Sequence, residues 1–114
     1  MADCLFCQIV AGQIPSAKVY EDDLLFAFAD IHPQAPLHVL VVPKRHIASV
    51  NELQPGDDAL VGEMIRRAGL LAREKGFDAS GFRVLFNTNR DAGQTVFHLH
   101  LHVLGGRALG WPPG

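Results

Sequence analysis

A run of seven residues, His98-Leu99-His100-Leu101-His102-Val103-Leu104, constrains the fold more than any other stretch of the chain. Side chains alternate between the two faces of a β-strand, so the three histidines would share one face. Leu99, Leu101 and Val103 would share the other face. We therefore predict a strand over residues 96–104, with one face available for chemistry and the other packed in the core.

The length and charge of the chain limit its partners. Its 114 residues suffice for one hydrophobic core but not two, so we expect a single domain over residues 1–114, ending in an irregular tail over 105–114. A formal net charge of -2 provides no basic surface for a nucleic acid polymer. No run approaches the roughly 20 apolar residues of a membrane span, and the first residues lack signal-peptide features. We expect a cytoplasmic protein that does not contact a membrane.

The spacing of apolar residues predicts helices and strands in the rest of the chain. The expected helices lie over 4–11 and about 55–75, and the further strands over 18–21, 24–29, 38–42 and 82–86. In the long helix, apolar residues that include Met64 and Ile65 recur at helical spacing. Several strands are joined by hairpin-length links. The pattern favours an α+β fold, an antiparallel sheet of about five strands with one short and one long helix.

The three histidines have three interpretations. They can be partly buried polar side chains that hydrogen-bond to backbone groups. They can form part of a metal site through a His-x-His pattern. Or one imidazole can be a nucleophile whose neighbours bind an anion. Asn87, Gly93, Gln94 and Thr95 lead into the strand and offer amide, hydroxyl and backbone donors for a phosphate. This surrounding favours nucleotidyl transfer through a histidine.

The histidine run resembles the signature of the histidine triad (HIT) family. It is preceded by Gly93-Gln94-Thr95 and followed by Gly105-Gly106-Arg107. Two further segments resemble the nucleotide-binding, phosphoramidase-type branch: Asp30-Ile31-x-Pro33-Gln34-Ala35-Pro36-x-His38 and the terminal Trp111-Pro112-Pro113-Gly114. The resemblance covers essentially the whole chain. It implies a homodimer whose antiparallel sheet continues from one subunit into the other.

The resemblance also implies roles for single residues. His100 would be the nucleophile that forms a covalent nucleotidyl-histidine, and His102 would contact the α-phosphate. His38 would support the nucleophile from the neighbouring strand. Asn87 would contact the phosphate or bridging atom, while Thr95, where this branch usually has serine, would hydrogen-bond near the leaving group.

A purine nucleotide pocket is the second implication of the resemblance. Asp30 would bind the ribose hydroxyls, although the same carboxylate at the end of a strand can also cap a turn. Gly93 and Gln94 would complete the phosphate loop. The purine slot would consist of apolar residues that, without the resemblance, read as core: Phe6, Ile9, Ile14, Phe28 and Ile31.

Two cysteines at the start of the chain suggest a metal. Cys4 and Cys7, together with His46 and His98, supply the four ligand types that tetrahedral zinc prefers. A lone C-x-x-C is a weak signal, since two small buried residues on an amphipathic helix give the same pattern. Some bacterial-type members that this chain resembles carry the pair with matching histidines and bind zinc. We therefore predict one structural zinc and no catalytic cofactor.

The resemblance implies a hydrolase of purine nucleoside 5′-phosphoramidates and related nucleotidyl compounds, which releases a nucleoside monophosphate. Two alternatives use the same pocket. One is a nucleotide-binding or protein-interaction module with incidental activity. The other is a dinucleoside polyphosphate hydrolase or nucleotidyltransferase, as in sister branches of the family.

Overall fold

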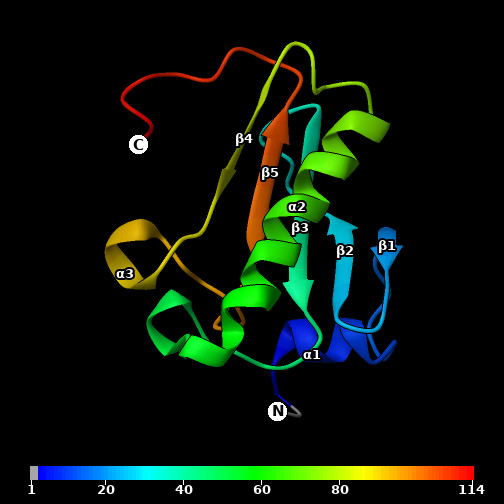
Figure 1. Cartoon of the computed structure of the whole chain (residues 1–114), viewed down its shortest axis with the longest axis vertical. Helices are drawn as coiled ribbons and strands as arrows, with labels where there is room; N and C mark the ends of the chain where they lie inside the picture. Colours follow the sequence, from blue (N-terminus) through cyan, green and yellow to red (C-terminus); the bar gives the residue numbers. More distant parts are fainter. Residues whose placement is uncertain (1–2) are drawn as a thin grey trace.

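The computed structural model describes residues 3–114 and contains a five-stranded sheet crossed by one long helix (Figure 1). The sheet order is β1-β2-β3-β5-β4, and every neighbouring pair is antiparallel. This confirms the predicted α+β class. The elements are α1 (Leu5–Val10), β1 (Lys18–Glu21), β2 (Leu25–Ala29), β3 (Leu37–Pro43), α2 (Asp58–Glu74), β4 (Phe82–Leu85), α3 (Asn89–Ala92) and β5 (Leu101–Gly105), with 3-10 turns at Val50–Glu52 and Pro55–Asp57.

The long helix forms where its apolar spacing predicts it. It begins at Asp58, after a 3-10 turn in which the Asp57 carboxylate accepts a hydrogen bond from the Gln54 backbone N–H at 2.8 Å. Met64, buried on the inner face, packs against the sheet, but Ile65 is 48% exposed. The residue after Met64 points about 100° further round the helix, so Ile65 lies beside the buried stripe.

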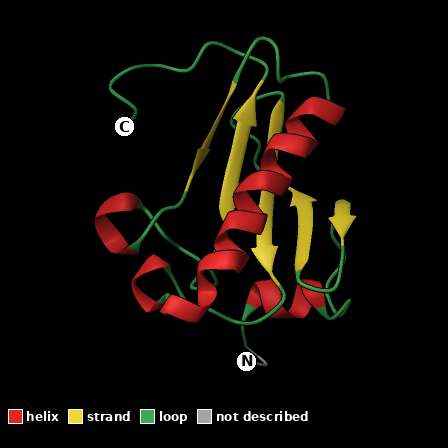
Figure 2. Cartoon of the chain, in the orientation of Figure 1, coloured by secondary structure: helices red, strands yellow, loops and turns green. Residues whose placement is uncertain are grey.

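Each face of the sheet packs against a different helix: α2 crosses one face, and the short α1 lies at the lower end of the strands (Figure 2). One face packs against α2 and carries the larger core, with members such as Leu25, Val41 and Leu101. The other face packs against α1 through a smaller cluster: Phe6, Ile9, Phe26, Phe28, Leu40 and Val42. Strand periodicity explains the division, since alternate residues of β2 and β3 go to opposite faces.

The histidine strand is shorter than predicted. The expected strand over 96–104 is observed as β5, and its ladder to β3 begins at the pair of Val41 with Leu101. Continuing that ladder would oppose residues 99–100 to the end of β3, where Pro43 has no N–H to donate. The backbone N–H of Leu99 instead donates to the Ile47 carbonyl at 2.6 Å. Alternation of side chains persists, because Leu99, Leu101 and Val103 all lie in the larger core.

The last residues follow an irregular path, as predicted for 105–114, but hydrogen bonds tie them to the domain. The Arg83 guanidinium donates to the Gly110 carbonyl at 2.9 Å, and Arg107 donates to the Gln34 carbonyl at 2.8 Å. Gly106 turns the chain at φ +91°, and a Cβ there would lie 2.8 Å from the Pro36 Cβ. Within residues 3–114, no helix has both the length and the hydropathy needed to cross a bilayer.

Candidate active site

A cavity of about 360 Å³ opens beside the histidine run, between α1, the end of β2 and the loop that precedes the run. One of its sides is apolar and the other carries imidazole, carboxylate, amide and hydroxyl groups. It brings together eleven of the residues predicted for the site: Phe6, Ile9, Ile14, Phe28, Asp30, Ile31, Asn87, Gly93, Thr95, His100 and His102.

Gln94 was predicted to contact the nucleotide, but it does not line the cavity. Its side chain is buried, and its amide group donates to the backbone carbonyls of Ala48 and Val96 at 2.9 and 3.1 Å. The amide oxygen accepts from the Asn89 N–H at 2.9 Å. Since all its polar groups bind backbone, Gln94 shapes the loop rather than the ligand surface. The structure therefore contradicts a direct contact.

Five further residues line the cavity without having been predicted: Leu5, Pro15, His32, Leu40 and Val96. Leu40 could have been found from sequence, because it lies two residues after His38 and therefore on the same face of β3. His32 lies in a proline-containing loop, and no periodicity places its side chain.

The apolar side of the cavity is built around Phe6. Its ring packs edge-to-face on Phe28, with centroids 5.4 Å apart, and on the His100 imidazole at 5.0 Å. Ile31 stands at the rim with 84% of its surface exposed. These apolar side chains and the His100 imidazole therefore line the same cavity.

The hydrogen bonds of His100 fix where its proton lies. Its Nδ1 is 2.7 Å from the His98 carbonyl oxygen, which can only accept, so Nδ1 carries the proton. The lone pair of the neutral ring is therefore on Nε2. Burial lowers the pKa of His100, against the opposing effects of that hydrogen bond and of Asp30. At neutral pH His100 is an uncharged imidazole with a free ring nitrogen, the form that can act as a nucleophile.

His38 and His102 form a second, complementary arrangement. The Gln34 backbone N–H donates to His38 Nδ1 at 3.0 Å, so the proton of neutral His38 is on Nε2. This Nε2 lies 2.9 Å from His102 Nδ1 and 3.4 Å from Asp30 Oδ2. If it donates to His102, the proton of neutral His102 is on its own Nε2. His100 and His102 then offer opposite groups to the cavity, a lone pair on His100 and an N–H on His102.

Asp30 caps a turn and also lines the cavity. One carboxylate oxygen, Oδ1, accepts from the His32 backbone N–H at 2.8 Å and so caps the turn after β2. The other, Oδ2, faces His38, while the residue also lines the cavity. A carboxylate with one oxygen in a turn retains acceptor capacity for a hydroxyl group.

The two cysteines and two histidines predicted as metal ligands converge. Their four donor atoms lie within 4.8 Å of one another. Cys4 Sγ and Cys7 Sγ lie 3.4 and 3.5 Å from His98 Nδ1, and Cys7 Sγ lies 3.4 Å from His46 Nδ1. With Zn–S near 2.3 Å and Zn–N near 2.0 Å, a tetrahedral ion separates sulfur and nitrogen ligands by about 3.5 Å. The spacing fits zinc.

The tautomer of His98 supports the same fit. Its Nε2 is 2.8 Å from the Pro43 carbonyl oxygen and therefore donates, which leaves an unprotonated Nδ1 toward both sulfurs. A backbone carbonyl on the distal nitrogen is the usual partner of a metal-binding histidine. Cys4 was expected inside the helix predicted over 4–11, but it precedes α1 as its N-cap. Its sulfur accepts a hydrogen bond from the Cys7 N–H at 3.4 Å.

A second group, Asp30, His38 and His102, is also close enough to be considered for a metal. The hydrogen bond from the Gln34 N–H to His38 Nδ1 argues against it, because the remaining nitrogen of that ring then holds a proton. A protonated ring nitrogen has no lone pair for an ion. We interpret these three residues as a chain of polar contacts that determines which ring nitrogens of His38 and His102 carry protons.

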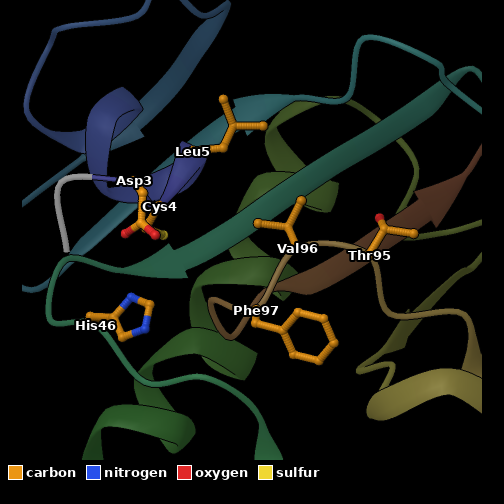
Figure 3. Close-up of a pocket in the computed structure, with 7 residues that line it drawn as sticks. All are labelled: Asp3, Cys4, Leu5, His46, Thr95, Val96 and Phe97. Atoms are coloured by element: carbon orange, nitrogen blue, oxygen red, sulfur yellow. The ribbon is translucent and has the colours of Figure 1, made fainter.

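The cysteine–histidine cluster borders a second cavity of about 510 Å³ (Figure 3). Cys4 and His46 line it together with Phe97, which is 50% exposed. Leu5, Thr95 and Val96 line both cavities. The metal-type cluster and the histidine site are therefore neighbours that share part of the same wall.

Burial of His102 and His38 makes stability fall in acid. Burial lowers the pKa of His102 to about 4, with His100 and His38 adding to the shift and Asp30 opposing it. Burial also lowers the pKa of His38, again opposed by Asp30. An unfolded histidine takes up its proton near pH 6.5. Between that pH and about 4 the unfolded chain binds more protons, so acid favours unfolding.

We therefore expect the urea midpoint to decrease as the pH falls from 6.5 toward 4, and His102→Gln to reduce this dependence. His32→Gln, at an exposed position, is the matched control and should keep the wild-type slope. Equal slopes for the wild type and the His102 variant would contradict the assignment.

Comparison with known proteins identifies the family. Residues 11–109 match the HIT domain family model. The purine nucleoside phosphoramidase of Escherichia coli K12 is 44% identical over 108 residues, covering 95% of this chain and 91% of that protein. A HIT family hydrolase from Legionella pneumophila superposes with a TM-score of 0.97 at 48% identity, covering 98% of this chain and all (100%) of that one.

A third relative is a zinc-bound histidine triad family protein from Mycobacterium smegmatis, which superposes with a TM-score of 0.80 at 36% identity. That match covers 93% of this chain and 76% of the other. The family model spans most of the chain, and the histidine run that lines the cavity lies within it. The chain therefore belongs to the histidine triad (HIT) family.

Proposed function

We propose that the protein hydrolyses purine nucleoside 5′-phosphoramidates through a covalent intermediate on His100. The observation that carries the proposal is the 2.7 Å hydrogen bond from His100 Nδ1 to the His98 carbonyl. It leaves an unprotonated Nε2 on a residue that lines a cavity with an aromatic wall. The name of the E. coli relative, purine nucleoside phosphoramidase, supports this substrate class.

The reaction would proceed in two displacements at phosphorus. In the first, a bond forms from His100 Nε2 to phosphorus, the P–N bond of the substrate breaks, and the amine leaves with a proton supplied by the Thr95 hydroxyl or the His102 imidazole. His102, with its Nε2–H, would contact the phosphate oxygens and offset their charge. In the second, water attacks phosphorus and returns a proton to the group that protonated the amine, the bond to His100 breaks, and a nucleoside monophosphate leaves. No catalytic cofactor is needed, because neutral imidazole is already a competent nucleophile.

The other cavity residues have proposed roles that follow the same geometry. Asp30 would accept from the ribose hydroxyls, and the Phe6 and Phe28 side would hold the purine with Ile9, Ile14 and Ile31. Asn87 and the Gly93 backbone would donate to phosphate oxygens. The Thr95 hydroxyl would contact the leaving group.

We propose that Cys4, Cys7, His46 and His98 hold one zinc ion. The ion would be structural, since four protein ligands leave no position for water. The sulfur–nitrogen spacing and the His98 tautomer support this proposal, as does the zinc-bound relative.

We further propose a cytoplasmic homodimer. Within residues 3–114, β4 pairs with β5 alone and its other edge is unpaired. Antiparallel pairing of this edge with the same edge of a second subunit would join the two sheets into one. It would also pair the backbone N–H and C=O groups that an exposed edge strand leaves open to other chains. Phe82 at this strand is 37% exposed, and Trp111 in the tail is 85% exposed.

A substrate panel tests the proposed activity. We expect kcat/KM for an adenosine 5′-phosphoramidate of a primary amine to exceed that for a diadenosine polyphosphate by about 100-fold, roughly 2.7 kcal/mol in the barrier. Release of AMP is followed by chromatography, with AMP affinity measured in parallel. The reverse order would favour the dinucleoside polyphosphate hydrolase, and binding without turnover would favour a nucleotide-binding module.

A further inference from the structure

His98 belongs to two sites at once. Its ring faces the two cysteine sulfurs, with Nδ1 at 3.4 Å from Cys4 Sγ and 3.5 Å from Cys7 Sγ. Its backbone carbonyl accepts the hydrogen bond from His100 Nδ1 at 2.7 Å. This hydrogen bond determines which nitrogen of His100 carries the proton and how the ring is turned. Whatever holds His98 in place therefore also orients His100.

The sheet does not hold this part of the chain. The β3–β5 ladder begins at Leu101, so His98 and His100 lie outside it. The His98 side chain is completely buried, and its Nε2 donates to the Pro43 carbonyl at 2.8 Å. Besides this bond, the Leu99 N–H bond to Ile47 and the burial of Leu99 in the core, His98 is held by the cysteine sulfurs and by ring contacts with His46 and Phe6.

A second route runs through Phe6. This residue lies between the two cysteines in α1, which is only six residues long. Its ring contacts both imidazoles, with centroids 6.0 Å from His98 and 5.0 Å from His100. The cysteines contact His46 and His98 and so hold α1 next to these histidines. They therefore also determine the position of the Phe6 ring against the His100 imidazole.

We propose that the Cys4-Cys7-His46-His98 cluster is a positioning device for His100, acting through the His98 carbonyl and Phe6, so that it supports the chemical step more than nucleotide binding. This inference rests on the proposed function. The cysteines themselves are positioning residues. They contact neither the reacting phosphorus nor, within the described residues, the His100 ring.

The test separates chemistry, binding and geometry in Cys4→Ser and Cys7→Ser. We expect the single-turnover rate of nucleotidyl-His100 formation to fall roughly 10- to 100-fold, the usual effect of disturbing an outer-shell partner or a near-attack geometry. AMP affinity should change less than about threefold by the same reasoning. In ¹⁵N-resolved NMR spectra, the His100 Nδ1–H signal should exchange faster with solvent or disappear.

Met64→Ala is the matched control. Met64 is completely buried in the core on the other face of the sheet, so its loss lowers stability without touching the cluster. At a temperature where all variants are folded, it should keep the wild-type rate and the His100 signal. Equal loss of rate in Met64→Ala would show that lower stability alone is responsible, and would overturn the proposal.

Metal exchange on the wild-type protein gives a second measurement that needs no variant. Removing metal with a chelator should weaken the His100 Nδ1–H signal, and adding Cd²⁺, which also prefers thiolate and imidazole ligands, should restore it. Wild-type rates and signals in the metal-free protein and in both serine variants would overturn the proposal. If no phosphoramidate is cleaved by the wild type, the proposed function fails, and the NMR signal still decides the positioning role.

Discussion

His100→Gly is expected to abolish phosphoramidate turnover while leaving nucleotide binding nearly intact. The substitution removes the ring whose Nε2 lone pair is left free by the hydrogen bond from Nδ1 to the His98 carbonyl. Removing the nucleophile of a covalent mechanism costs at least about 10³-fold in kcat. The apolar wall and Asp30 remain, so AMP affinity should change only a few-fold. Steady-state kinetics and titration calorimetry with AMP measure the two effects.

The glycine also creates space for a designed control. Free imidazole added to His100→Gly can occupy the vacated volume and restore part of the turnover, whereas it should do nothing for His100→Gln, whose side chain fills that space. Mass spectrometry of wild-type protein quenched during turnover should place the nucleotidyl group on the peptide that contains His100. Unchanged turnover in the glycine variant, or a nucleotide on another residue, would contradict the nucleophile assignment.

The spacing of apolar residues was sufficient to predict the fold. The differences occur at the ends of strands and at the edges of the buried helix stripe, which this spacing does not determine. Alternation in residues 98–104 correctly separated the core leucines from the histidines, although the ladder itself begins only at Leu101. Where a ladder ends depends on its partner strand, here on Pro43, and the run itself does not contain that information. Helical spacing likewise gives the direction of the buried stripe of α2 but not its width, and Ile65 lies beyond its edge.

The candidate site was harder to predict because its residues have two possible uses. Phe6 and Phe28 are buried in the smaller core and also line the cavity, so their composition alone reads as core. The family resemblance supplied the second use. Gln94 shows the opposite case, since an amide near a phosphate loop can serve the ligand or the backbone. Only the three-dimensional contacts show that it serves the backbone.

The proposed zinc site leads to the second large effect. Protein purified without chelator should contain about one zinc per chain, as the four-ligand set implies. A ligand that binds only the folded state stabilises it by about 2.7–4.1 kcal/mol when its free concentration is 100–1,000 times Kd. For a domain of this size, removing the ion should then lower Tm by roughly 10–20 °C. Metal analysis and calorimetry with and without chelator measure both quantities.

The double variant Cys4→Ser, Cys7→Ser should contain no zinc, unfold at the lower temperature and show no response to chelator. His32→Gln provides the matched control, since it removes an exposed histidine outside the cluster and should keep both metal and Tm. The cluster joins α1 to the loops around His46 and His98, which are far apart in sequence. Wild-type protein without zinc, and a double variant that unfolds at the wild-type temperature, would together show that the four side chains only pack.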